Sequence, residues 1–449
     1  MPQRKFVATQ ILVFDLELFI GVRFTAVPQT LLQDLPTCPP PDKMVVRMKK
    51  ITTISVLLLI ALCPDAQAHS KIERIWLTYR ANTPSSIVVS WETETPENST
   101  VRYRAGNDPE QRISVDGNAT LHHVEIPIDK KDVVYHYSVH SGSMSSLVHT
   151  FKGLPTSEFR VAVAANWQRR PALDAILKDD IHLLLTAGDN INNTWQQGGA
   201  GTKECTTPYS DLIDAYPALF RSVPFMPVLG NHDKEFRPRG STPPDTPVYD
   251  IEATAFRKFF ELPDEEWKWH FDVPEFDIRF IALDLNHISD MGTTWQACHP
   301  FHRGSSQYEW YMSLMGSPKQ RFIVTLYNEK NSSVRRQEDS SWQKMLENGT
   351  VCISGFGYFA EKAVRGDFVY YNTSLSGTGD KYPDPNSVLL LSEHNYILMT
   401  LEAKPSRMVV EMKDLTGKTL DKSVYLSVDS IVYKPKQLSN DGSKKWKTQ

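Results

Sequence analysis

The chain has 449 residues, which is more than one hydrophobic core usually supports, so we expect two globular domains with additional terminal segments. Hydrophobic residues make up 41% and charged residues 23%, a balance that excludes a disordered or membrane-embedded protein. The formal net charge of −4 gives no reason to expect nucleic acid or an anionic membrane as a partner.

Residues 48–68 have the three parts of a secretory signal peptide. Two lysines follow Met48, residues 51–62 form an apolar run too short to span a bilayer, and small residues precede a cleavage point after Ala68. We therefore predict a secreted or periplasmic protein and interpret residues 1–47 as an overextended, unstructured start. The alternative is a chain that is not exported, in which the apolar run is a buried strand.

Residues 71–155 alternate short apolar stretches with gaps rich in Asn, Pro and Gly, the pattern of half-buried strands separated by turns. The predicted strands are 72–79, 87–91, 100–104, 121–126, 134–139 and 147–151. This pattern predicts a small antiparallel β-sandwich of the fibronectin type III kind.

After residue 155 the pattern changes to continuous apolar runs that alternate with segments of helical spacing, which is typical of strands buried on both faces. The predicted strands are 160–165, 181–187, 225–229, 278–285, 322–326 and 351–354, and the predicted helices are 171–178, 209–222, 253–260 and 306–314. We predict an α/β layered domain over residues 159–415 and a disordered tail over 434–449.

Two motifs directly follow buried strands: Gly188-Asp189 and Gly230-Asn231-His232-Asp233. Ligands gather at the carboxyl ends of strands in open α/β sheets, so polar residues there indicate a site. Gly-Asp alone is a common turn, whereas Asn and His in a strand-to-helix turn favour a functional interpretation.

These motifs resemble the second and third motifs of calcineurin-like metallophosphoesterases. Residues 159–168 resemble the first motif of that family, residues 307–310 the segment before the fourth, and residues 354–362 the last. The predicted β-sandwich is similar to the N-terminal domain of purple acid phosphatases. The resemblance covers residues 71–415 and implies that fold throughout.

The resemblance also implies a chemistry, in which two metal ions about 3.5–4 Å apart clamp a phosphoryl group and activate a water molecule. Asp189 would be the bridging carboxylate and Asn231 a ligand through its amide oxygen. His232 would face the leaving oxygen, and Asp233 would orient His232.

Most of the other ligand positions of the family are substituted. The substituted positions are Asn166, Gln168, Asn192, Tyr327 (followed by Asn328), Phe356 and Tyr358. All three expected imidazole ligands are missing, and aromatic rings take the place of two of them. We therefore predict no metal or a weakly bound divalent metal, and weak or absent phosphoester hydrolysis.

Alternatives remain open at this stage. The histidines and cysteine at positions 287, 298, 299 and 302 could form a rearranged metal site, and the tryptophans at positions 167, 195 and 295 could stack on a ligand. The leading hypothesis is a family member with an eroded metal site and a phosphate-containing small molecule as its partner. The others are an active phosphatase or phosphodiesterase with an altered metal site, and an extracellular binding or adhesion module.

Overall fold

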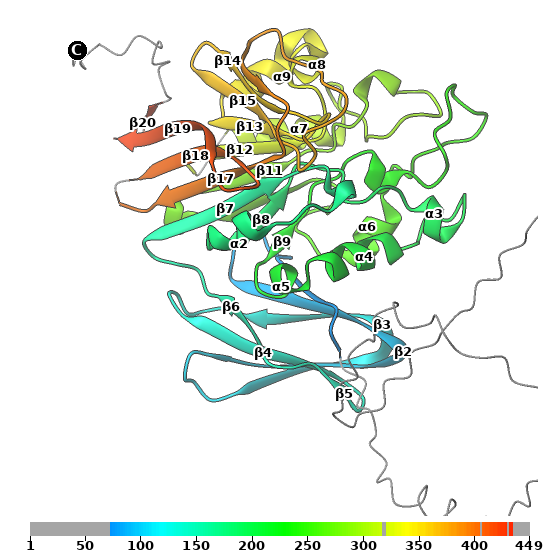
Figure 1. The fold of residues 1–449 in the computed structure, drawn as a ribbon, viewed down its shortest axis with the longest axis vertical. Helices are drawn as coiled ribbons and strands as arrows, with labels where there is room; N and C mark the ends of the chain where they lie inside the picture. The colour runs from blue at the N-terminus through cyan, green and yellow to red at the C-terminus, as the bar shows by residue number, and fades with distance from the viewer. Residues whose placement is uncertain (1–71, 317–319, 405, 429–430, 434–449) are drawn as a thin grey trace, which may run out of the picture. The chain divides into compact units, whose positions relative to one another are not determined.

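The computed structural model (Figure 1) describes residues 72–316, 320–404, 406–428 and 431–433. The predicted signal peptide over 48–68, the segment 1–47 and the tail 434–449 lie outside the described residues, so those predictions stay predictions. In the described ranges, every helix is too short or too polar to cross a lipid bilayer.

The N-terminal part is an antiparallel sheet. Its strands are β1 (Ile75–Thr78), β2 (Ser86–Ala105), β3 (Gln111–Pro127), β4 (Val134–Ser141), β5 (Met144–Ser145) and β6 (His149–Lys152). Two strands predicted as separate are the two halves of β2, which pairs with β1 through its first half and with β4 through its second. The middle of β2 is exposed and its register against β3 shifts there. Its residues therefore lack the apolar alternation that predicts a strand, and the sequence predicted a loop between two strands. An antiparallel β-rich N-terminal region is confirmed.

The rest of the chain forms two further sheets. One has the order β20-β19-β18-β17-β7-β8-β9 and the other β10-β11-β12-β13-β15-β14-β16. Their strands are β7 (Glu158–Ala164), β8 (Leu183–Thr186), β9 (Phe225–Met226), β10 (Trp269–Val273), β11 (Ile278–Ala282), β12 (Phe322–Tyr327), β13 (Val351–Ser354), β14 (Ala360–Arg365), β15 (Phe368–Asn372), β16 (Ser387–Leu391), β17 (Asn395–Glu402), β18 (Arg407–Asp414), β19 (Thr419–Val428) and β20 (Ile431–Tyr433).

Short helices connect these strands. They are α2 (Asp174–Lys178), α3 (Trp195–Gly198), α4 (Thr207–Ala215), α5 (Pro217–Phe220), α6 (Thr254–Phe259), α7 (Ser306–Gly316), α8 (Asn331–Arg335) and α9 (Gln337–Glu347). Single turns of 3-10 helix occur at Trp167–Arg169, His232–Lys234, Pro274–Phe276 and Ile288–Asp290. The predicted helix over 209–222 is divided into α4 and α5 because Pro217 stands at the start of the second helix.

Apolar residues cover both faces of the sheet that contains β11, β12 and β13. One face joins the main core, which also holds the N-terminal sheet, where Trp76 stacks on Phe259 with ring centroids 4.2 Å apart. The other face packs against α7 and α9 in a second core that includes Tyr311 and Trp342. Burial on both sides is why these strands are uniformly apolar in the sequence.

The parallel strands fix the position of the candidate site. β7, β8 and β9 run parallel in one sheet, and β11, β12, β13 and β15 run parallel in the other. The carboxyl ends of the two sets meet, since the Leu375 amide donates to the Ala165 carbonyl and the Asn328 side chain donates to the Ala187 carbonyl. The shared direction of the strands within each set thus brings the motif residues together at one edge, which we call the strand-end site.

Candidate functional site

Asp189 lies at the centre of the strand-end site, directly after β8. Its side chain is buried, and its backbone has the left-handed φ of 58° that Asp tolerates better than most residues. The Oδ1 atom accepts a hydrogen bond from the His232 amide at 3.3 Å. Gly230 has to be glycine, because a Cβ atom there would overlap the Asp189 carboxylate. Burial raises the pKa of Asp189, and the neighbouring His232 and Gln168 oppose that rise.

His232 is oriented by a backbone carbonyl. Its Nδ1 atom lies 2.6 Å from the carbonyl oxygen of Asn192, whose own side chain is exposed. Burial lowers the pKa of His232, but the Asp189 carboxylate and the Asn192 carbonyl outweigh it, so the pKa is raised. The His232 side chain keeps 30% of its surface exposed and is therefore accessible from solvent.

Asp233 is fully buried beneath the site. Its carboxylate accepts hydrogen bonds from the Gly230 amide at 2.8 Å and from the Asn190 side chain at 3.1 Å. The Tyr209 hydroxyl donates to the Asp233 carbonyl at 3.1 Å. Burial and the charge of Asp189 raise the pKa of Asp233 to about 7. These contacts make Asp233 a support for the loop around Gly230.

The Asn166 amide ties the first motif to the last. Its Nδ2 atom lies 2.8 Å from the Gly355 carbonyl oxygen, 3.0 Å from that of Gly357 and 3.0 Å from the Ser374 hydroxyl. The Asn166 side chain is 1% exposed. An NH2 group can only donate, so this face of Asn166 offers nothing to a cation.

Asn328 makes a second link of the same kind. Its Nδ2 atom donates to the Ala187 carbonyl at 2.9 Å and reaches the Gly355 carbonyl at 3.3 Å. Tyr327, which the sequence placed at this ligand position, points to the second core and donates its hydroxyl to Asn331 at 2.7 Å. Side chains of a strand alternate between faces, so the residue that reaches the site is Asn328.

Aromatic rings occupy the positions of the last motif. Phe356 packs against Tyr382 with ring centroids 5.1 Å apart and against His287 at 5.9 Å. Tyr358 lies close enough to Asp189 for that carboxylate to help burial raise the tyrosine pKa. Asn231 is buried beside the hydroxyl of Tyr249.

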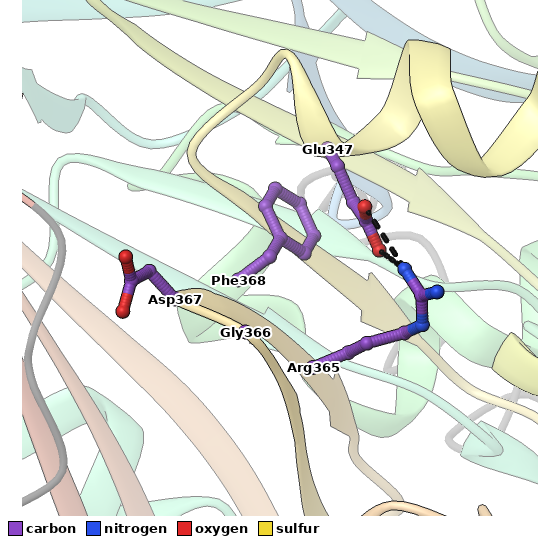
Figure 2. Close-up of a pocket in the computed structure, with 5 residues that line it drawn as sticks. All are labelled: Glu347, Arg365, Gly366, Asp367 and Phe368. Carbon is purple, nitrogen blue, oxygen red and sulfur yellow. Dashed lines mark hydrogen bonds and ion pairs between the residues drawn. The ribbon is translucent and has the colours of Figure 1, made fainter.

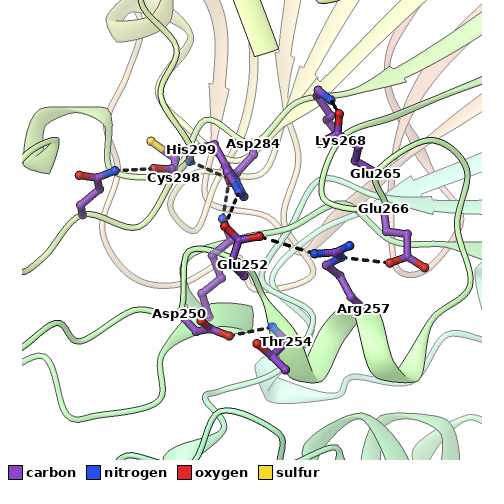
Figure 3. A network of polar contacts seen from close by, with 12 residues as sticks. Asp250, Glu252, Thr254, Arg257, Glu265, Glu266, Lys268, Asp284, Cys298 and His299 are labelled. Carbon is purple, nitrogen blue, oxygen red and sulfur yellow. Dashed lines mark hydrogen bonds and ion pairs between the residues drawn. The ribbon is translucent and has the colours of Figure 1, made fainter. Parts of the chain in front are cut away.

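The alternative group of histidines and cysteine does not converge on one point. His299 hydrogen-bonds to Asp284, with 2.7 Å between Nδ1 and Oδ2 (Figure 3). The His299 ring also stacks on Trp267, with ring centroids 3.6 Å apart. His287 instead contacts the Arg239 guanidinium at 2.9 Å. Cys298 is buried, and burial raises its thiol pKa. Within the ranges that the structure describes, no three or more His, Cys, Asp or Glu side chains are grouped to hold a metal ion.

The Asp284 carboxylate belongs to a buried ion pair. Lys234 Nζ lies 2.6 Å from Asp284 Oδ2, and neither side chain is exposed. The Lys234 ammonium opposes the effect of burial and holds the pKa of Asp284 at about 2. His302 is exposed and contacts the backbone of Arg303. This ion pair links the loop after Asp233 to the end of β11 and has a structural role.

The tryptophans predicted to line the site differ in their surroundings. Trp167 is fully buried among the rings of Tyr216, Phe220 and Phe225. Trp195 and Trp295 are partly exposed. The indole of Trp195 donates to Glu235 at 3.1 Å, and the indole of Trp295 to the Arg239 carbonyl at 2.9 Å. Trp167 is therefore a core residue.

A surface hollow of about 470 Å³ lies away from the strand-end site. It is lined by Glu347, Arg365, Gly366, Asp367 and Phe368 (Figure 2). The ion pair between Arg365 and Glu347 spans 3.0 Å at this hollow. Phe368 begins β15, which runs parallel to β13, so the hollow lies at the opposite end of these strands from the site.

Comparisons with known proteins agree with this architecture. Residues 148–352 match the model of the calcineurin-like phosphoesterase family. A solved structure titled "Structure of PhoD" is similar at 12% identity and a TM-score of 0.56, covering 85% of this chain and 95% of that one. Another, "GAP50 the anchor in the inner membrane complex of Plasmodium", has 13% identity and a TM-score of 0.38, covering 59% and 88%. No curated protein matches.

The described residues do not fit the pair of metal ions that the family uses. Asp189 is the retained carboxylate, while the amide groups of Asn166 and Asn328 are turned toward backbone carbonyls. Phe356 has no atom that can bind a cation, and Tyr358 offers a phenol oxygen whose pKa is raised, in place of an imidazole nitrogen. The side chains at the site therefore differ in chemical type from the carboxylate and imidazole ligands of a two-metal centre.

Proposed function

We propose that this protein is a metallophosphoesterase-fold protein that has lost two-metal hydrolysis and serves as an exported binding or accessory protein. The observation that supports this best is the use of Asn166 and Asn328. Both side chains donate hydrogen bonds between strand-end loops, at positions where the family resemblance implies metal ligands.

The charge at the site supports the same proposal. Two divalent ions would bring four positive charges beside Asp189, which is buried and has a raised pKa. An uncompensated charge in a partly desolvated site is strongly unfavourable. Changes in residues that only support metal ligands reduce affinity or activity by about 10–100-fold, and the loss of the ligands themselves should cost more.

The amide links also give the site a stability of its own. In a metal enzyme the cations hold the strand-end loops together, and removing them loosens the site. Here the Asn166 amide alone joins the loop after β7 to Gly355, Gly357 and Ser374. A fold that is held together in this way has no need of a cation for its integrity.

The proposed setting is outside the cytoplasm, with residues 48–68 as the signal peptide and cleavage after Ala68. Within the exported chain we propose a fibronectin type III-like domain over 71–155 and the phosphoesterase-like domain over 159–415. A phosphate-containing small molecule is the proposed ligand.

A second candidate is an active phosphoesterase with an altered, single-metal site built on Asp189, Asn231 and His232, in which Asp189 and Asn231 would hold the ion and His232 would face the leaving oxygen. It is favoured by the exposure and raised pKa of His232, which suit a proton donor to a leaving group.

Hydrolysis of an aryl phosphate separates the two candidates. The purified chain would be assayed with and without added Zn²⁺, Mn²⁺ and Fe²⁺, beside His232→Ala and the control His302→Ala, whose side chain is exposed and contacts the Arg303 carbonyl. We expect no metal-dependent rate above background. A rate that His232→Ala abolishes and His302→Ala leaves intact would establish the single-metal enzyme instead.

A further inference from the structure

Phe356 and Tyr358 stand at the two imidazole positions of the last motif, and each has a basic side chain over the face of its ring. Lys330 Nζ lies 5.4 Å from the ring centroid of Phe356 and 4.1 Å from that of Tyr382. The Arg169 guanidinium carbon lies 5.9 Å from the ring centroid of Tyr358. Cation–π contacts hold both charges near the site.

Neither cation forms an ion pair with a carboxylate in the part of the chain that the structure describes. Arg169 donates to the Thr378 hydroxyl at 2.6 Å, which leaves most of its guanidinium donors free, and its side chain is exposed. The ammonium of Lys330 faces the two rings, and the Lys330 side chain is partly exposed. Two positive charges at the rim of the site are thus available to a ligand.

Three carboxyl groups lie near these cations and limit their field, and one of them is Asp189, the buried carboxylate that helps to raise the pKa of Tyr358. Asp380 is exposed and accepts a hydrogen bond from the Tyr382 hydroxyl at 3.4 Å. Glu329 is buried and bound to the backbone amides of Ile288 and Lys330, and burial raises its pKa to about 7. Both oxygens of the Glu329 carboxylate are thus engaged by backbone amides, and Glu329 offsets part of the charge of Lys330.

We infer that the strand-end site binds a phosphate group or a similar oxyanion without metal, with Lys330 and Arg169 supplying the positive charge. Arg presents several donors in a planar fork that matches phosphate oxygens, and Lys contributes a compact charge. The ring of Tyr382, 38% exposed, is available to stack on an organic group attached to the phosphate. This inference rests on the proposed function, because it assumes a site without the metal pair.

Calorimetric titration with inorganic phosphate in the presence of EDTA tests the inference, at constant ionic strength with chloride as the blank anion. Lys330→Gln and Arg169→Gln should each weaken phosphate binding about tenfold or more, since each removes a charge-assisted contact. Lys344→Gln and Arg336→Gln, which change exposed residues of α9 and the end of α8, should leave it unchanged. Circular dichroism would verify that each variant is folded, and Lys330→Arg should keep most of the affinity.

Three results would overturn the inference. Binding that requires added metal would refute it and the proposed function together. A chain that holds no metal and gives no heat with phosphate would refute the inference and leave the proposed function standing. Binding that Lys330→Gln and Arg169→Gln do not weaken would place the anion elsewhere.

Discussion

The substitution Asn166→Asp restores the residue type that the family resemblance implies at this position, and it tests how the strand-end loops are held together. The Asn166 amide has two hydrogens and three acceptors within 3.0 Å, so about two hydrogen bonds are lost. A carboxylate would then face the Gly355 and Gly357 carbonyl oxygens in a position that is 1% exposed. Two lost hydrogen bonds cost roughly 2–3 kcal/mol, and a buried unpaired charge brings the total to roughly 3–5 kcal/mol.

Urea unfolding at pH 7, with EDTA and then with Mn²⁺ or Zn²⁺, measures this cost. We expect the destabilisation of Asn166→Asp to be the same in all three conditions and to shrink at low pH, where a protonated carboxyl can again donate. The control Asn192→Asp changes an exposed side chain and should shift the free energy of unfolding by less than about 0.5 kcal/mol. A variant that is as stable as the parent chain, or that Mn²⁺ restores to the same stability, would refute the reasoning.

Three further predictions follow from other parts of the structure. Chelators should leave the unfolding temperature of the parent chain unchanged in a calorimetric scan, because a chelator lowers that temperature only by removing a metal ion that stabilises the native state. A drop in the unfolding temperature would reveal such an ion. The parent chain and His122→Asn should differ in how their stability depends on pH between about 6.5 and 4 in urea titrations. Burial lowers the pKa of His122 to about 4, so the unfolded chain binds more protons at this residue in that window, and the residue costs roughly 3 kcal/mol of stability as the pH drops, a cost that His122→Asn should remove. Gly230→Ala should cost more than about 2 kcal/mol because its Cβ atom would overlap Asp189, whereas Gly316→Ala, with open space around it, should be nearly neutral; equal effects would contradict the close approach.

Strands buried on both faces were predictable because continuous apolar runs leave little ambiguity. The segment Val351–Ser354 was predicted with its observed bounds, and β7, β8 and β12 within a few residues. The antiparallel strands β17, β18 and β19 were not assigned. β17 pairs with β7, whose residues lie more than 200 positions earlier, and a pattern confined to one stretch of sequence cannot reveal such pairing.

At the site, the motif spacing predicted that Asp189, Asn166 and Gly355 lie close together, because each of them follows a parallel strand. The offset between Tyr327 and Asn328 was not resolved, since a shift of one residue in a strand reverses which face a side chain occupies. Arg169 and Lys330 carry no motif signal. Their contacts with the aromatic rings of the last motif form only when the chain folds, so no local sequence pattern predicts them.

Metal content after exposure to excess cation tests the central claim most directly. The chain would be dialysed against Zn²⁺, Mn²⁺ or Fe²⁺, passed through a desalting column and analysed for elements against protein concentration. The account predicts far less than one ion per chain in every case. Two tightly held ions per chain, lost when Asp189 is replaced by alanine, would contradict it.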